Sequence, residues 1–121
     1  MFSYYCHMNW NQLTHIAQLE TIDRDSATQP ILIFKHSTRC STSSMALARV
    51  ERSWGKQTTS LPTPFYLDLI KHRDISNSIA ERYGVEHQSP QVLVIAKSRC
   101  IYSQTHSAIS VEEMLEETQQ E

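Results

Sequence analysis

The sequence is poor in glycine and proline and has no long uninterrupted run of apolar residues. It contains two glycines and four prolines in 121 residues, and it shows no internal repeat, which excludes a repeat architecture. No apolar stretch approaches the roughly 18 residues that a membrane-spanning helix needs. The first ten residues, MFSYYCHMNW, lack the basic flank and apolar core of a secretory signal peptide. We therefore expect a cytoplasmic protein that does not bind membranes.

Neither sign of charge dominates the sequence. Eleven lysines and arginines stand against 13 aspartates and glutamates, for a net charge of −2. This balance gives no sign of the strongly basic surface with which proteins bind nucleic acids. The length corresponds to a single domain. We expect this domain at residues 9–117, between a flexible leader at residues 1–8 and a polar tail at residues 118–121.

Cysteine is scarce too, and the cysteines present do not form pairs. Cys6, Cys40 and Cys100 are an odd set without CxxC spacing, which is a poor disulfide framework and fits a reducing compartment. The six histidines are scattered along the chain, whereas zinc sites need clustered ligands. We therefore expect no metal site and no bound cofactor.

The spacing of the apolar residues predicts a chain of mixed α and β structure. Helical spacing predicts helices at residues 11–23, 40–53 and 75–83, and one that opens at residue 111. Short apolar or alternating runs predict strands at residues 31–34, 65–69, 92–96 and 100–104. Parallel βαβ units followed by an antiparallel hairpin give a mixed four-stranded sheet with helices on both faces. This α/β arrangement is the thioredoxin-like fold, preceded here by an extra N-terminal helix.

Cys40 is predicted to lie between a buried strand and the start of the next helix. Free N–H groups and the helix dipole favour an anion at such a point, and a thiolate is such an anion. Arg39 and Lys35 add positive potential. A thiolate is the nucleophile of thiol–disulfide exchange, so we expect Cys40 to be the reactive residue. The alternative is a buried, unreactive cysteine, which the polar neighbours Arg39 and Ser41 disfavour.

Ser43 occupies the place of the second cysteine of a CxxC motif. A serine cannot attack a mixed disulfide, so another molecule must resolve it. We expect the Ser43 hydroxyl to hydrogen-bond the Cys40 sulfur. Ser41, Thr42 and Ser43 also suit the capping of a helix start, and the two roles are compatible. The pattern predicts an exchange site with one thiol.

The other two cysteines are not expected to act at this site. Cys100 follows the hairpin at the far edge of the sheet, roughly 20 Å from Cys40 by strand rise. A disulfide requires Cα atoms within about 7 Å, so Cys100 cannot resolve a mixed disulfide on Cys40. Cys6 lies in the predicted leader, and its position does not exclude contact with the site.

The dipeptide Ser89-Pro90 is the second indication of the site. A proline is permitted as the first residue of a buried strand. In thioredoxin-like folds this proline is typically cis and lies opposite the cysteine, and the backbone of the residue before it pairs with an extended substrate. We expect these roles for Pro90 and Ser89. An ordinary trans proline at the start of a strand is the alternative.

Three segments together resemble a known family. FKHSTRCSTSSMA, YGVEHQSPQVLVI and THSAIS are similar, in this order, to segments of the monothiol bacilliredoxins, and the resemblance extends from about Met8 to Leu115. The family usually has Pro-Ile after the cysteine, where this chain has Ser41-Thr42. The first turn of the helix therefore lacks the proline that stiffens it.

The resemblance implies a substrate and a set of site residues. Cys40 would attack the mixed disulfide between a protein and bacillithiol, a low-molecular-weight thiol, and release the protein thiol. The implied partners are bacillithiolated proteins and the exchange thiol, with no nucleic acid and no membrane. The substrate-binding residues would be Thr38, Arg39, Ser43, Ser89 and Pro90.

Three other functions share parts of this pattern. A monothiol glutaredoxin, acting on glutathione or carrying an iron–sulfur cluster, would have a Gly-Gly turn where Lys97-Ser98-Arg99 stands. The final helix would also receive a glutathione carboxylate at its start, where Glu112 and Glu113 would repel it. A thioredoxin-like binding module without catalysis would leave Cys40 incidental. An arsenate reductase would need an arginine cluster, which the sequence lacks.

Overall fold

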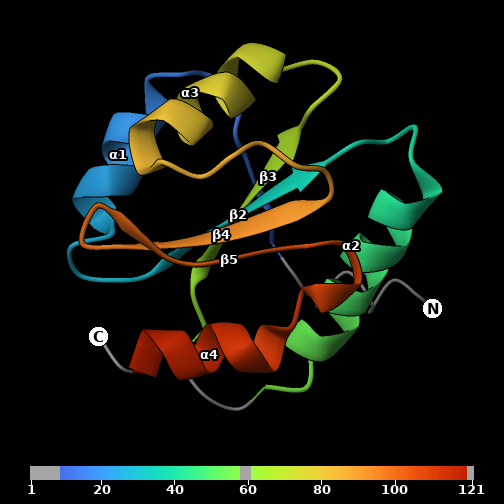
Figure 1. Ribbon diagram of the computed structural model, residues 1–121. Coiled ribbons are helices and arrows are strands. Elements are labelled where there is room, and N and C mark those ends of the chain that lie inside the picture. Colours follow the sequence, from blue (N-terminus) through green and yellow to red (C-terminus); the bar gives the residue numbers. More distant parts are fainter. Residues whose placement is uncertain (1–8, 58–60, 120–121) are drawn as a thin grey trace.

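The computed structural model describes residues 9–57 and 61–119, and Figure 1 shows how the elements are arranged. The strands are β1 (Asn11–Gln12), β2 (Ile31–His36), β3 (Thr63–Asp68), β4 (Gln91–Ala96) and β5 (Arg99–Thr105). The helices are α1 (Gln18–Asp25), α2 (Ser41–Trp54), α3 (Arg73–Tyr83) and α4 (Val111–Gln119), with a short 3₁₀ turn, η2 (His106–Ala108), before α4.

The strands form one mixed sheet in the order β1-β3-β2-β4-β5. β3 runs parallel to both β1 and β2, whereas β4 is antiparallel to β2 and β5. Every residue of β2 and β4 is buried, as expected for strands at the centre of a sheet with both faces covered. The predicted mixed α/β fold is confirmed, with a fifth, two-residue strand, β1, at one edge.

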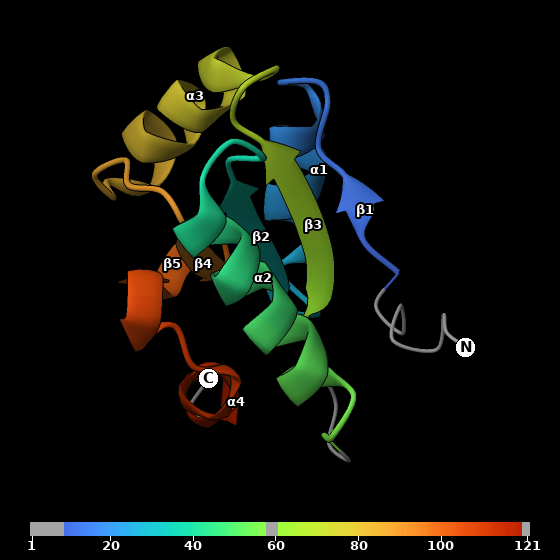
Figure 2. The same cartoon turned by 90° about the vertical axis from the view of Figure 1, so that its right-hand side faces the viewer.

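Helices cover both faces of the sheet (Figures 1 and 2). Because side chains alternate along a strand, β2 contributes to two separate cores. Leu32 and Phe34 pack with residues of α2 and α4, and Ile31 and Ile33 pack with residues of α1 and α3. Residues near the end of β2 therefore have side chains on opposite faces of the sheet.

The predicted helix at residues 11–23 is wrong in its first half. Asn11 pairs with Phe65 of β3, and α1 begins only at Gln18. The Gln18 side-chain amide accepts hydrogen bonds from the backbone N–H groups of Thr14 and His15, at 2.7 and 2.9 Å. This arrangement closes a turn where the apolar spacing had indicated a helix, because the spacing alone does not reveal the pairing with β3.

The predicted helix boundaries elsewhere agree closely with the structure. Gly84 ends α3 in the left-handed conformation, with φ of 67°, which a glycine adopts without steric cost. At the start of α4 the Ser110 hydroxyl accepts a hydrogen bond from the Glu113 N–H at 3.2 Å. The Ser110 N–H donates to the Tyr102 hydroxyl at 3.3 Å, so Tyr102, and not the Glu113 side chain, accepts this hydrogen bond.

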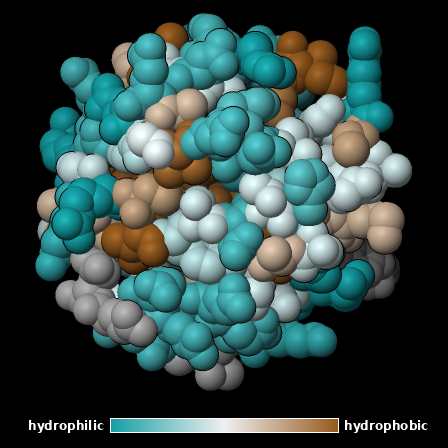
Figure 3. Space-filling model, viewed as in Figure 1, coloured by the Kyte–Doolittle hydropathy of each residue, from teal (hydrophilic) through white to brown (hydrophobic). Residues whose placement is uncertain are grey.

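The ends of the chain are only partly described. The predicted leader, residues 1–8 with Cys6, lies outside the described residues. α4 includes Thr118 and Gln119 of the predicted tail. Within the described ranges no helix combines the length and the hydrophobicity needed to cross a membrane. The face in Figure 3 is mainly hydrophilic, with small, separate hydrophobic areas.

Candidate active site

Cys40 is the N-terminal capping residue of α2. Its backbone is extended, with φ of −112° and ψ of 117°, and its carbonyl accepts the first helical hydrogen bond, from the Ser44 N–H at 3.1 Å. A turn closed by the Cys40 N–H and the Ser37 carbonyl, at 3.1 Å, connects β2 to the helix. The half-buried thiol thus lies beside the N-terminal turn of a 14-residue helix, where the helix dipole favours negative charge.

An open groove of about 460 Å³ lies next to this thiol. β2 ends beside the start of β4, where Lys35 pairs with Gln91, so the loop between α3 and β4 lies near the end of β2 (Figure 1). The Ser89-Pro90 peptide bond in this loop is cis. The groove is lined by Ser37, Cys40, Leu69, Ile70, Arg73, His87 and Ser89.

The predicted site residues differ in their relation to the groove. Cys40 and Ser89, which are 49 positions apart, both line it. Pro90 is buried directly after Ser89. Thr38 and Arg39 are exposed in the turn before Cys40, and neither lines the groove.

Ser43 is buried, and its hydroxyl forms hydrogen bonds with residues at the end of β2. It accepts a hydrogen bond from the Ser37 N–H at 3.1 Å and shares one with His36 Nδ1 at 2.7 Å. Within the described residues its hydroxyl makes these two hydrogen bonds and none to the Cys40 sulfur. Ser43 therefore joins the end of β2 to the first turn of α2.

His36 lies on the α2 face of the sheet and is 4% exposed. Its ring lies 5.5 Å from the Tyr66 ring and 6.2 Å from the Phe34 ring, measured between centroids. Burial lowers the pKa of His36, although the nearby carboxylates of Asp68 and Glu51 oppose the effect. The imidazole is therefore neutral at neutral pH, and one nitrogen is held by the Ser43 hydroxyl.

We predict that Ser43→Ala lowers the free energy of unfolding by about 1–3 kcal/mol, because buried hydrogen-bonding groups lose their partner. The groups left unpaired are the Ser37 N–H and His36 Nδ1. Urea unfolding measures the change, and Ser44→Ala, at an exposed position of the same helix, is the matched control. Equal stability of the two variants would show that the Ser43 hydrogen bonds contribute nothing to the fold.

Lys35 lies on the opposite face of β2 from His36. It is fully buried, and its Nζ has no hydrogen-bond partner among the described residues. Burial, and then the charge of Arg73, lowers the pKa of Lys35 to about 8. In the sequence, a lysine directly after the apolar run Ile31–Phe34 indicated a source of positive charge near Cys40.

Five of the groove residues were not predicted from the sequence, and two of them, Arg73 and His87, carry ionisable side chains. Arg73 is the first residue of α3, and His87 lies in the loop before β4, where its Nδ1 shares a hydrogen bond with the Ser76 hydroxyl at 2.8 Å. No motif marked either position, because both enter the groove through the packing of α3 against the sheet.

Cys100 lies at the opposite end of the sheet from Cys40. It pairs with Ile95 of β4, and Ile95 pairs with Ile31 at the start of β2. Burial raises the pKa of the Cys100 thiol, and the thiol donates a hydrogen bond to the Tyr102 carbonyl at 3.2 Å. The separation predicted from topology is confirmed, so Cys100 cannot resolve a disulfide formed at Cys40.

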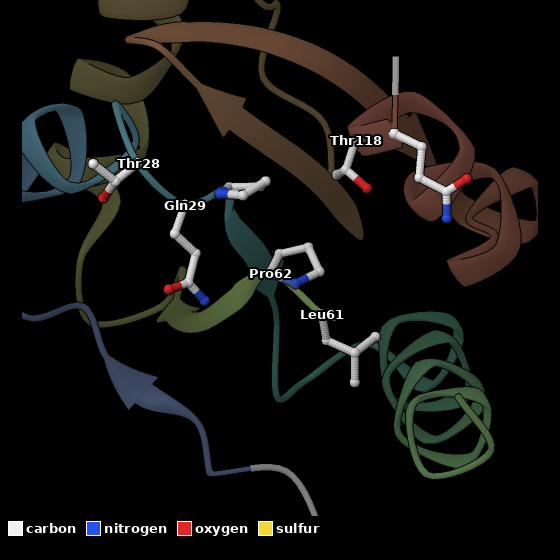
Figure 4. Close-up of a pocket in the computed structure, with 7 residues that line it drawn as sticks. Thr28, Gln29, Leu61, Pro62 and Thr118 are labelled. Carbon is white, nitrogen blue, oxygen red and sulfur yellow. The ribbon is translucent and has the colours of Figure 1, made fainter. Parts of the chain in front are cut away.

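A second concavity lies away from Cys40. Its volume is about 350 Å³, and Figure 4 shows Thr28 and Gln29 near the start of β2, opposite Leu61, Pro62 and Thr118. None of its lining residues titrates or carries a thiol. Across the described residues no group of three histidine, cysteine or acidic side chains is placed to hold a metal ion.

A thioredoxin fold with one cysteine at the start of α2, beside a cis proline, defines a class of thiol–disulfide oxidoreductases that use a single thiol. This chain belongs to the monothiol bacilliredoxin BrxC family, whose profile matches residues 11–114. The family assignment from the three sequence segments is thereby confirmed, as is thiol–disulfide exchange as the type of reaction.

Solved structures show the same fold at low sequence identity. A candidate oxidoreductase with a thioredoxin fold superposes with a TM-score of 0.75 at 21% identity, over 97% of this chain and 99% of the other. The thioredoxin of Malassezia sympodialis gives 0.70 at 12% identity, over 93% and 91%. Thioredoxin NaTrxh of Nicotiana alata gives 0.65 at 13%, over 93% and 92%.

Proposed function

We propose that this protein removes bacillithiol from proteins, with Cys40 as the nucleophile and with a second thiol molecule to regenerate it. The observation that carries the proposal is the isolation of Cys40 at the start of α2, in an open groove. Ser43 stands in place of a second cysteine and is bound to His36, and Cys100 lies at the far end of the sheet. Resolution therefore falls to a thiol from another molecule.

The reaction consists of two exchanges that balance in atoms and electrons. The Cys40 thiolate attacks the bacillithiol sulfur of the mixed disulfide, so a Cys40–bacillithiol disulfide forms and the protein leaves as a thiolate. A low-molecular-weight thiolate then attacks the bacillithiol sulfur. The Cys40 thiolate is released, together with a disulfide of the two small thiols. No bound cofactor takes part.

The proposed protein substrate lies over the groove. Two large hydrophobic side chains near Cys40 are exposed. Ile70, 45% exposed, lines the groove with Cys40, and Met45, 70% exposed, follows Cys40 in α2. They offer apolar contact to a substrate segment. In this arrangement the backbone of Ser89, next to Pro90, pairs with the extended segment, as in β-strand addition. Thr38 and Arg39 reach the substrate from the exposed turn. The proposed setting is the cytoplasm, with bacillithiolated proteins as partners.

The choice of small thiol is tested with one protein substrate prepared as two mixed disulfides. We expect the bacillithiol adduct to be reduced at least about tenfold faster than the glutathione adduct, which corresponds to a difference of about 1.4 kcal/mol in transition-state binding. Release of the protein thiol, followed by mass spectrometry, gives both rates, and the Cys40→Ala variant gives the background. Reduction of neither adduct above background would overturn the proposal.

A glutathione-specific, glutaredoxin-like function is the second candidate. It would be favoured if the glutathione adduct were reduced faster. Glu112 and Glu113 are exposed in the first turn of α4. Their charges oppose a carboxylate at that helix start, and this argues against the glutaredoxin mode of binding.

A further inference from the structure

The end of the sheet beside Cys40 contains two buried polar atoms without partners. Among the described residues, Lys35 Nζ and Ser89 Oγ are buried and make no hydrogen bond. Ser89 lines the groove with Cys40. Lys35 pairs with Gln91, two residues after Ser89, so both atoms belong to the same end of the sheet. A buried ammonium group without a partner is strongly unfavourable, and a ligand that accepts its hydrogen bonds would remove the penalty.

Two further side chains add positive charge or hydrogen-bond donors at this end of the sheet. Arg73 and His87 both line the groove. Burial, and then the charges of Lys35 and Arg73, lowers the pKa of His87, and Arg73 also lowers the pKa of Lys35. Arg73 and His87 line the groove, and Lys35 lies at the same end of the sheet through its pairing with Gln91. The groove therefore has positive potential at neutral pH.

Acidic side chains do not neutralise this potential. Within residues 9–57 and 61–119, side-chain ion pairs form at Arg24 and Arg82 and not at Arg73. Asp68 is next to Leu69 of the groove, but it pairs with His36 and so belongs to the other face of the sheet. Its carboxylate accepts the Ile70 N–H at 3.0 Å. Asp74 and Glu86 are exposed to solvent, and no carboxylate contributes to the lowered pKa of Lys35 or of His87.

We propose, on the basis of the proposed function, that Lys35, Arg73 and Ser89 form a subsite for a carboxylate of the low-molecular-weight thiol. Arg73 and Ser89 donate hydrogen bonds to the carboxylate, and Lys35 contributes its charge from β2. The first exchange leaves the small thiol bound to Cys40, which itself lines the groove. The groove, about 460 Å³ in volume, then holds the remainder of that molecule. The subsite selects exchange thiols that carry negative charge.

The test uses small thiols that differ mainly in charge. A reporter peptide with one cysteine and no acidic residue is prepared with 3-mercaptopropionate, 2-mercaptoethanol or cysteamine in mixed disulfide linkage. Each enzymatic rate is divided by the rate with dithiothreitol, which corrects for the reactivity of the disulfide. We expect the anionic adduct to react about tenfold faster than the neutral one, since hydrogen bonds between ionised groups are the strong ones. The cationic adduct should be slowest.

Two variants and a control test which residues cause the preference for the anionic adduct. Lys35→Met and Arg73→Gln should each reduce the ratio of the anionic to the neutral rate toward one. Lys97→Met, which removes an exposed charge in the turn between β4 and β5, should leave the ratio unchanged. Since Arg73 is exposed, its replacement leaves the fold intact and keeps the test valid if Lys35→Met is unstable.

The outcomes separate the subsite from the proposed function. Equal normalised rates for all three adducts in the wild-type protein, or a preference that persists in both variants, would overturn the subsite and leave the exchange activity standing. Failure of the wild-type protein to reduce any adduct would overturn both. A second peptide, with aspartates and the neutral adduct, tests the other source of a carboxylate. If the variants slow only this peptide, the subsite binds the protein substrate and the proposal is wrong.

Discussion

Cys40→Ala is expected to reduce the release of protein thiol from a bacillithiolated substrate to the uncatalysed rate, a loss of at least about a thousandfold. Cys40 lines the groove at the start of α2, and the Cys100 thiol is half-buried at the other end of the sheet. No other thiol of the described residues is therefore placed to replace it. The rate of thiol release under single-turnover conditions measures the effect.

The matched control replaces the other cysteines. A Cys6→Ala, Cys100→Ala variant should keep its activity within about threefold of wild type, because Cys100 lies at the opposite end of the sheet from Cys40 and substitutions away from a site have small effects. Mass spectrometry after a reaction without regenerating thiol should find one bacillithiol on Cys40. An adduct on Cys100, or loss of activity in the double variant with its fold intact, would contradict the one-thiol mechanism.

Lys35→Met is expected to stabilise the folded protein by about 1–3 kcal/mol at pH 7, since replacing an unpaired buried charge with an apolar group of similar size removes a desolvation penalty. Lys35 is fully buried and its Nζ lacks a partner among the described residues. Urea unfolding in a buffer without carboxylate or phosphate measures the change. Lys97→Met, at an exposed position, should change stability by less than about 0.5 kcal/mol.

The pH dependence of this difference provides a second check. Burial and Arg73 lower the pKa of Lys35 from its usual 10.5 to about 8 in the folded protein. Between these two values the unfolded chain binds more protons than the folded protein, so stability rises with pH. The penalty on wild type is fully present below pH 8 and disappears as the pH approaches 10.5. The advantage of Lys35→Met should therefore disappear over the same range.

Stability that is equal or lower in Lys35→Met would show that the ammonium group is compensated in the folded protein. The result expected here, greater stability combined with poorer selection of anionic thiols, would be a trade of stability for function. An unpaired buried lysine has no benefit for folding, and the proposed carboxylate subsite would account for its presence.

The type and order of most elements could be predicted from the sequence because the signals are local. The apolar runs Ile31–Phe34 and Val92–Ala96 lie within the central strands β2 and β4, and continuous apolar residues suit a strand buried on both faces. Gly84 ends α3 through its left-handed backbone, and Ser110 caps α4 through its hydroxyl, so these predicted boundaries depended on local chemistry. The N-terminal helix was misplaced because Asn11 and Gln12 join the sheet through a distant partner, β3.

The candidate site was predictable only in part. Cys40 and Ser89 were found because a cysteine after a buried strand and a proline before one are features of the sequence itself. The expected bond from Ser43 to the Cys40 sulfur gave way to a bond with His36, because Ser43 is buried on the inner side of α2. Arg73 and His87 carry no local signal. Their place in the groove depends on how α3 packs.

The sequence by itself determined the fold class, the position of Cys40 between a strand and a helix, and its separation from Cys100, since each follows from local periodicity and from the rules of strand connection. Only the tertiary structure decided which side chains surround that thiol. The alternation of side chains on β2 directs His36 toward Ser43 and Lys35 toward the face of α3. Contacts between residues so far apart in the chain depend on register and packing, which the local pattern of residues does not specify.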